Sequence, residues 1–178
     1  MISLNHIGAK FTLDFCFSYL SRKMRVMHLS LCDNYNHSVS NRYKLIQYRS
    51  SFMDEKRTIH LSCFPGSNYF GVDKFIKSSR FIPSMSFLLY DKNICKFIGE
   101  IDVEKVFKTY CICNVGILPD YRGLGLSKFM INELLYNIHT NEVKDLYLVV
   151  KRDNNIAINL YSHFGFKFVY IAAAVQRL

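Results

Sequence analysis

Residues 114–128 read N-V-G-I-L-P-D-Y-R-G-L-G-L-S-K, and this stretch decides the fold. Its start, 115–118, is extended and apolar, and Pro119 ends it because proline offers no N–H to a sheet. A glycine turn follows at 120–125. An amphipathic helix is then predicted from Leu126, because apolar residues recur every fourth position as far as Ile138. A strand, a glycine turn and a helix start form an anion site, since unpaired N–H groups converge there at the positive end of the helix dipole.

A second pair of elements lies further along the chain. Residues 144–150, K-D-L-Y-L-V-V, predict a buried strand, and residues 154–166, N-N-I-A-I-N-L-Y-S-H-F-G-F, predict a short helix that ends at a glycine. Together the two regions resemble the GNAT superfamily of N-acetyltransferases. Its signatures are [RQ]-x-x-G-x-[GA] after a strand and, later, N-x-x-A-x-x-L-Y-x-x-x-G-F. The matching residues are Arg122 and Gly125 in the first signature and Asn154, Ala157, Leu160, Tyr161, Gly165 and Phe166 in the second.

One position departs from the family pattern, because Ser127 stands where glycine or alanine is usual. Serine is small enough for a phosphate to approach. The resemblance is specific over residues 94–168, vague over 43–93 and absent over 1–42. We therefore assign 43–178 to a GNAT acetyltransferase domain and 1–42 to an N-terminal extension of uncertain structure.

The resemblance implies an α/β fold. Its central sheet is mostly antiparallel and splayed between its fourth and fifth strands, and helices cover both faces. The residue patterns allow the same element order. They predict strands at 43–49, 86–90, 96–103, 109–118 and 144–150, and helices at 51–63, at 72–81, from 126 and from 154.

The C-terminal end is short for the family. After Phe166 the pattern gives one strand at 168–171, where the family has two strands joined by a turn. This predicts either an abbreviated wall on the acceptor side or a sheet edge completed by a second copy of the chain, as in a homodimer.

Composition narrows the class of protein. The 178 residues are half apolar, which suits one domain, and the net charge of +9 is scattered rather than gathered in a stripe. Nucleic acid is therefore not the expected main ligand, and the phosphates of coenzyme A account for part of the basic excess. The apolar run at 11–20 is too short to span a membrane and contains Asp14, and without a basic start and a small-residue cleavage site we expect no secretory signal. We expect a cytoplasmic protein without a membrane span.

The six cysteines do not predict a metal site. The one close pair, Cys111 and Cys113, lacks a second pair and a nearby histidine. Buried free thiols are the simpler interpretation, and no metal cofactor is expected.

The resemblance places acetyl-CoA along the 114–128 stretch. In the family, pantetheine lies between the splayed strands and pairs with exposed main chain, and the N–H of Ile117 would bind the thioester carbonyl and then its oxyanion. Asn154 would contact the pantetheine arm, although it could equally cap a helix. The predicted cofactor-binding residues are Val115, Ile117, Arg122, Gly123, Leu124, Gly125, Leu126, Ser127, Lys128, Asn154, Ala157 and Tyr161.

Two residues are predicted to move protons. Tyr161 matches the family's general acid, which protonates the departing thiolate; packing against Phe166 is its structural alternative. Glu100 is the candidate general base, because it shares a strand face with Asp102 and Glu104, although such a stripe is more often exposed to solvent. His163 lies near the second motif, where a structural role is the more common one.

The sequence thus predicts an acetyl-CoA-dependent N-acetyltransferase that acts on a primary amine by direct attack in a ternary complex. The acceptor, a small molecule or a protein, stays open. A non-catalytic acyl-CoA-binding or regulatory protein on the same fold is the first alternative. A basic nucleic-acid-binding module is the second.

Overall fold

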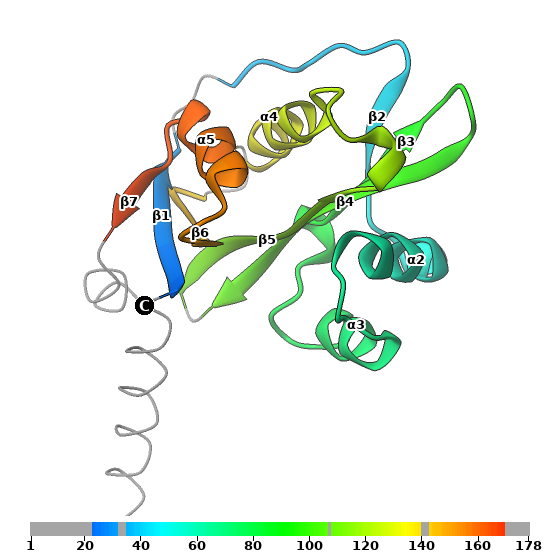
Figure 1. The fold of residues 1–178 in the computed structure, drawn as a ribbon, viewed down its shortest axis with the longest axis horizontal. Coiled ribbons are helices and arrows are strands. Elements are labelled where there is room, and N and C mark those ends of the chain that lie inside the picture. The colour runs from blue at the N-terminus through cyan, green and yellow to red at the C-terminus, as the bar shows by residue number, and fades with distance from the viewer. Residues whose placement is uncertain (1–22, 32–34, 107, 140–142, 170–178) are drawn as a thin grey trace, which may run out of the picture.

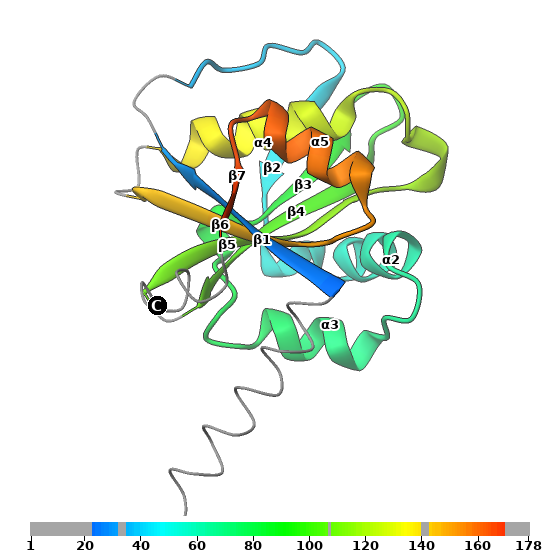
Figure 2. The same cartoon turned by 60° about the vertical axis from the view of Figure 1, so that its left-hand side comes forward.

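The computed structural model describes residues 23–31, 35–106, 108–139 and 143–169. They form one seven-stranded mixed sheet with the strand order β2-β3-β4-β5-β6-β1-β7. Helices α4 and α5 cover one face of this sheet, and α2 and α3 lie against the other face (Figures 1 and 2). The predicted α/β architecture, with helices on both faces, is confirmed.

The elements follow the predicted order closely. The strands are β1 (Met24–Ser30), β2 (Tyr43–Gln47), β3 (Phe87–Asp91), β4 (Lys96–Val106), β5 (Thr109–Ile117), β6 (Asp145–Lys151) and β7 (Lys167–Val169). The helices are α2 (Met53–Cys63), α3 (Tyr69–Ile76), α4 (Leu126–Ile138) and α5 (Asn155–His163), with short 3₁₀ turns at Ser50–Phe52, Pro83–Met85 and Pro119–Tyr121.

The second predicted helix is displaced along the chain. It was expected at 72–81 but runs from Tyr69 to Ile76, because the side chain of Asn68 accepts a hydrogen bond from the Gly71 N–H and caps the helix start. The predicted end of the last strand at 170–171 and the apolar run at 11–20 lie outside the described residues. Within the described residues, no helix is long and apolar enough to cross a membrane.

The sheet opens between β5 and β6, its only parallel neighbours in the described chain. The two strands pair solely through residues 110–112 of β5 and 146–148 of β6. Just beyond this pairing, Asn114 takes a left-handed conformation with φ 51° and the register of β4 against β5 shifts. This bulge bends β5 away from β6, so the C-terminal halves of the two strands diverge. These two strands correspond to 109–118 and 144–150, the fourth and fifth of the strands predicted from the sequence, so the predicted splay is confirmed.

The N-terminal strand β1 lies within the sheet, between β6 and the edge strand β7, rather than outside the domain. It pairs antiparallel with β6 over seven positions, from Met24 opposite Lys151 to Ser30 opposite Asp145, and with β7 through its other edge. The segment 1–42, separated from the domain in the sequence analysis, therefore contributes a strand to it. This strand lies between β6 and β7, and the homodimer stays a prediction.

The apolar core lies mainly between the sheet and α4. Four side chains of this helix, Met130, Ile131, Leu134 and Leu135, are fully buried against sheet residues such as Ile101. On the opposite face, α2 packs closely on β5, because a Cβ at Gly116 would come within 2.8 Å of the Cβ of Cys63.

Candidate active site

A row of unpaired N–H groups lies where β5 turns into α4. The N–H groups of Gly123, Leu124, Gly125, Leu126 and Ser127 have no hydrogen-bond acceptor within the described part of the chain. Gly123 and Gly125 adopt φ +78° and +74°, and the space beside each Cα is open. Both glycines therefore make a left-handed turn that L-residues adopt poorly, and the row of donors faces solvent at a helix N-terminus.

Arg122 and Lys128, the two ends of the predicted cofactor-binding stretch 122–128, use their N–H groups within the turn and do not join this row. The Arg122 N–H donates to the Pro119 carbonyl at 3.2 Å, and the Lys128 N–H donates to the Gly125 carbonyl at 3.0 Å. The Arg122 guanidinium donates through Nε to the carbonyl of Ile117 at 3.0 Å. Within the predicted set, residues 123–127 thus carry the main-chain donors, while Arg122 ties the turn to the end of β5.

The open edge of β5 presents further donors to the gap. The Leu118 N–H donates to the Ile98 carbonyl of β4 at 2.9 Å. Because successive N–H groups of a strand alternate in direction, the N–H groups of Ile117 and Val115 point the other way, toward β6. Both predicted residues therefore lie on the unpaired edge of β5, which leads directly into the glycine turn.

Tyr161 comes from α5 and lies beside the bulge in β5. Its side chain is 8% exposed, its ring packs 5.8 Å from the ring of Phe166, and its hydroxyl makes no hydrogen bond to the described residues. Burial raises the pKa of Tyr161 to about 12, and the nearby Cys113 adds to the shift. The phenol is thus protonated at neutral pH. Both the packing and the proton-donor interpretations fit this position.

The other residues of the second motif stabilise the start of α5. The Asn154 side chain accepts a hydrogen bond from the Ala157 N–H at 3.1 Å, so the alternative role as a helix cap is confirmed. Its contact with a pantetheine arm stays a prediction. His163 lies exposed at the other end of α5, where its ring touches that of Phe164.

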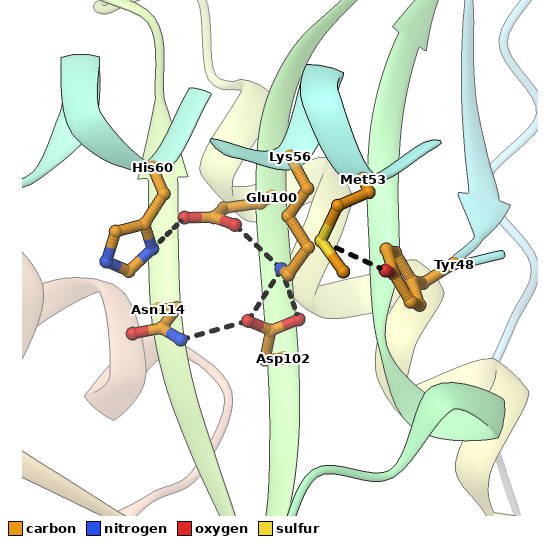
Figure 3. A network of polar contacts seen from close by, with 7 residues as sticks. All are labelled: Tyr48, Met53, Lys56, His60, Glu100, Asp102 and Asn114. Atoms are coloured by element: carbon orange, nitrogen blue, oxygen red, sulfur yellow. Dashed lines mark hydrogen bonds and ion pairs between the residues drawn. The ribbon is translucent and has the colours of Figure 1, made fainter. Parts of the chain in front are cut away.

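Glu100 and Asp102 are fully buried, so the exposure expected for the stripe they form is wrong. Lys56 of α2 reaches between them: its Nζ lies 2.7 Å from Glu100 Oε2 and 2.8 Å from both Asp102 oxygens (Figure 3). His60 and Asn114 complete the network, at 2.7 Å from Glu100 Oε1 and 2.9 Å from Asp102 Oδ2. Both oxygens of Glu100 are therefore occupied, and it faces no open space itself.

Burial and charge work against each other in this network. Burial lowers the pKa of Lys56, but the charges of Asp102 and Glu100 outweigh it and hold that pKa above its ordinary value. Burial also disfavours the charged form of Asp102 and therefore raises its pKa. The charge of Lys56 opposes this shift, and the charge of Glu100 adds to it. Lys56 is charged at neutral pH and pairs with two carboxylates.

The sequence analysis missed Lys56 and His60. A lysine and a histidine four residues apart on a helix usually mark its solvent face. Their importance depends on two acidic residues that lie about 40 positions further along the chain; Lys56 and Glu100 are 44 positions apart.

The fold and the site together define a class of protein. A strand edge left unpaired by a splay, leading into a glycine turn with free N–H groups at a helix start, suits an extended ligand that ends in phosphates.

Comparison with known proteins specifies this class. Residues 83–168, just under half of the chain, match the family model described as the acetyltransferase (GNAT) domain, and this region is similar to the GNAT superfamily. It is 33% identical over 76 residues to a [ribosomal protein bS18]-alanine N-acetyltransferase of Haemophilus influenzae, a match that covers 43% of this chain and 51% of that protein. The chain thus spans about half the length of this curated relative.

Solved structures share the fold. A GCN5-related N-acetyltransferase from Sphaerobacter thermophilus superposes with a TM-score of 0.71 at 17% identity, over 86% of this chain and 53% of the other. An aminoglycoside N-acetyltransferase, AAC(6')-Iy in complex with CoA, gives a TM-score of 0.59 at 13% identity, over 75% and 95% of the two chains.

Proposed function

We propose that the protein transfers an acetyl group from acetyl-CoA to a primary amine by direct attack in a ternary complex. The observation that carries this proposal is the row of unpaired N–H groups at residues 123–127, continuous with the open edge of β5. Five donors at a helix start suit a pyrophosphate, and a strand edge suits the amide groups of pantetheine. The CoA held by a structural neighbour is consistent with this assignment.

The open edge of β5 would also stabilise the reaction. A thioester carbonyl lying along this edge would accept a hydrogen bond from the N–H of Ile117 or Val115. A preorganised donor of this kind typically lowers a barrier by about 3 to 4 kcal/mol, because the oxyanion needs it more than the carbonyl does.

Tyr161 would donate its hydroxyl proton to the departing sulfur. A phenol with a pKa of about 12 is a weaker acid than a thiol in water, whose pKa is about 8.5. Burial changes this balance, because it also raises the pKa of a thiol: Cys63 and Cys111 both rise to about 11. A thiolate released in the same buried place would therefore be a stronger base than in water, and proton transfer accompanying C–S cleavage is reasonable.

The acceptor would be a cation in water, and the surface near Ile117 suits one. A groove of about 480 Å³ begins at Leu118, and its walls carry the exposed carboxylates of Asp54 and Glu55 and the aromatic rings of Tyr90 and Phe97, with one basic side chain, Lys96, among them. The H. influenzae relative is named for an alanine of a ribosomal protein. A protein α-amine is thus one acceptor to test, beside polyamines, lysine side chains and aminoglycosides.

The test is turnover of acetyl-CoA with such a panel of amines, measured as release of free thiol and as mass of the acetylated product. Thiol release that depends on one class of amine would support the proposal. Tight acetyl-CoA binding without amine-dependent release would instead establish the non-catalytic acyl-CoA-binding alternative.

A second test probes the phosphate site by calorimetry. Gly125→Glu should abolish acetyl-CoA binding in a folded protein, because it places a carboxylate where the diphosphate would lie. Gly125→Gln has the same bulk and the same left-handed strain without the charge, and should bind more weakly than wild type but measurably. Gly66→Glu, at φ +94° with open space around it, repeats strain and charge elsewhere and should bind normally. Normal affinity in Gly125→Glu would refute the assignment.

A further inference from the structure

His60 is the ionisable member of the buried charge network that is partly exposed. It lies one turn after Lys56 on α2, its side chain is 13% exposed, and its Nδ1 is 2.7 Å from Glu100 Oε1. Its other ring nitrogen points away from Glu100, over β5 (Figure 3). The ring therefore connects a buried carboxylate to the side of β5 that borders the splay.

Glu100 sets the tautomer of this histidine. An ionised carboxylate only accepts hydrogen bonds, so Nδ1 of His60 must carry the proton that it donates to Glu100. In the neutral ring, Nε2 then holds a lone pair. Lys56 donates to the second oxygen of Glu100 and fixes the carboxylate, so the direction of the histidine lone pair is fixed as well.

The same network holds the bulge that opens the sheet. Asp102 accepts hydrogen bonds from Lys56 and from the side chain of Asn114, the residue with φ 51° where β5 leaves β6. His60 and the splay of β5 are therefore positioned by one rigid set of contacts.

His60 is connected to the proposed thioester site through Phe64. Its ring lies 4.8 Å from that of Phe64, and a Cβ added to Gly116 would be 3.2 Å from Cε2 of Phe64. Gly116 lies between Val115 and Ile117, whose N–H groups face the gap. An amine that approaches these donors from the α2 side would meet Phe64 and, next to it, His60.

We propose that His60 is the general base that deprotonates the acceptor amine, directly or through one water, and that Glu100 and Lys56 are positioning residues. This inference rests on the proposed acetyltransferase function. It assigns the base role to a residue of α2 and gives Glu100 a supporting part, where the sequence suggested Glu100 itself.

The proton balance is complete. The ammonium form of the acceptor gives one proton to Nε2 of His60, which later releases it to solvent. The nitrogen lone pair then forms the bond to the carbonyl carbon, and the C–S bond breaks with its electron pair going to sulfur. The nitrogen loses its second proton to solvent, and the sulfur takes one from Tyr161, which solvent replaces. The products are an amide, a free thiol and one released proton.

The experiment compares two acceptors in the wild type and in three variants. His60→Asn keeps an amide N–H that can donate to Glu100 but has no basic nitrogen. With an alkylamine acceptor, its kcat/KM at neutral pH should fall by about 10² to 10³, and the loss should shrink as the pH approaches the amine pKa of about 10.4. With hydroxylamine, which is uncharged at neutral pH, the loss should be less than about fivefold, since no proton has to be removed before attack.

The matched control is His28, a second histidine–carboxylate pair at the far end of β6. Its Nε2 lies 2.6 Å from Asp145 Oδ1, and its side chain is 16% exposed. His28→Gln should keep the wild-type pH profile with both acceptors. Glu100→Gln, which no longer requires Nδ1 to carry the proton, should repeat the acceptor-dependent loss of His60→Asn and serves as the second variant if the latter folds poorly.

Three outcomes would overturn the proposal. An unchanged pH profile in His60→Asn would exclude the base role while leaving the acetyltransferase function intact. Equal losses with the alkylamine and with hydroxylamine would show that His60 supports structure or binding only. Absence of amine-dependent turnover in the wild-type chain, with CoA still bound, would remove the proposed function and this role with it.

Discussion

The two faces of the sheet are both buried, but they are built from opposite kinds of side chain. Toward α4 the sheet presents Ile101 and Val103, which pack against fully buried apolar residues of that helix. Toward α2 the same strand presents Glu100 and Asp102, also fully buried, with Lys56 between them. One strand thus supplies an apolar core on one side and an ionic network on the other.

This difference separates two tasks. Apolar burial contributes free energy of folding in proportion to area and tolerates small changes of shape. A buried ion network contributes little net stability, because desolvation offsets its attraction, but each member holds its partners in one geometry. The α4 face therefore stabilises the sheet, and the α2 face fixes the bulge and His60 beside the proposed reaction site.

The largest expected effect is on rate and comes from Tyr161, on the α4 and α5 side. Tyr161→Phe keeps the ring and should lower kcat by about 10² to 10⁴ with little change in acetyl-CoA affinity. Steady-state kinetics with a true acceptor measures this. Wild-type kcat in the variant would mean that Tyr161 only packs, as the apolar face around it does.

The same variant makes a prediction about pH and stability. Burial penalises the phenolate and holds the folded-state pKa of Tyr161 at about 12, above its ordinary value of 10.0, so the free energy of unfolding is unaffected by this group below about pH 10 and falls as the pH rises from 10 through 12. The shift corresponds to about 3 kcal/mol. Chemical unfolding should therefore show that the free energy of unfolding of the wild type falls by about 3 kcal/mol relative to that of Tyr161→Phe between pH 10 and pH 12. A difference in unfolding free energy that stays constant over this range would contradict the burial of Tyr161.

On the α2 face, Lys56→Met should reduce the free energy of unfolding by about 3 to 5 kcal/mol at neutral pH. It removes the cation from between two buried carboxylates and leaves their charges uncompensated. Denaturant titration measures the loss, which should diminish at low pH, where the carboxylates accept protons. A loss independent of pH would show that the side chain only fills space.

On the α4 face, Leu134→Ala should cost about 3 kcal/mol, because it leaves a cavity at a fully buried position. The same titration should give a loss that does not vary between acidic and neutral pH. This flat dependence, set against the pH-dependent loss in Lys56→Met, sharpens the contrast between the faces. A strong pH dependence of the stability loss in Leu134→Ala would contradict this contrast between the two faces.

The smallest effect is expected on the outer side of α2. Arg57 pairs with Asp54 and Asp73 at 2.7 Å, but Asp54 is 89% exposed and water competes with the pair. Arg57→Gln should leave the unfolding midpoint within experimental scatter. A large shift would show that ion pairs on α2 matter whether buried or not.

The sequence alone determined the apolar alternation, the glycine turn and the helix after it. Each depends on neighbours a few positions apart: Pro119 ends the strand, Gly125 permits the left-handed turn, and apolar residues four positions apart give α4 its buried stripe. The strand order from β2 to β6 and the splay followed from the family resemblance that these local patterns carry.

Only the tertiary structure decided what lies across the sheet. Alternation along β4 shows that Glu100 and Asp102 share a face, but it cannot show that α2 covers that face with Lys56 and His60. The place of β1 has the same cause. Met24–Ser30 becomes a strand of this sheet only because β6, more than 110 residues away, offers it a free edge. Local propensity fixes which residues point together, and long-range packing fixes what they meet.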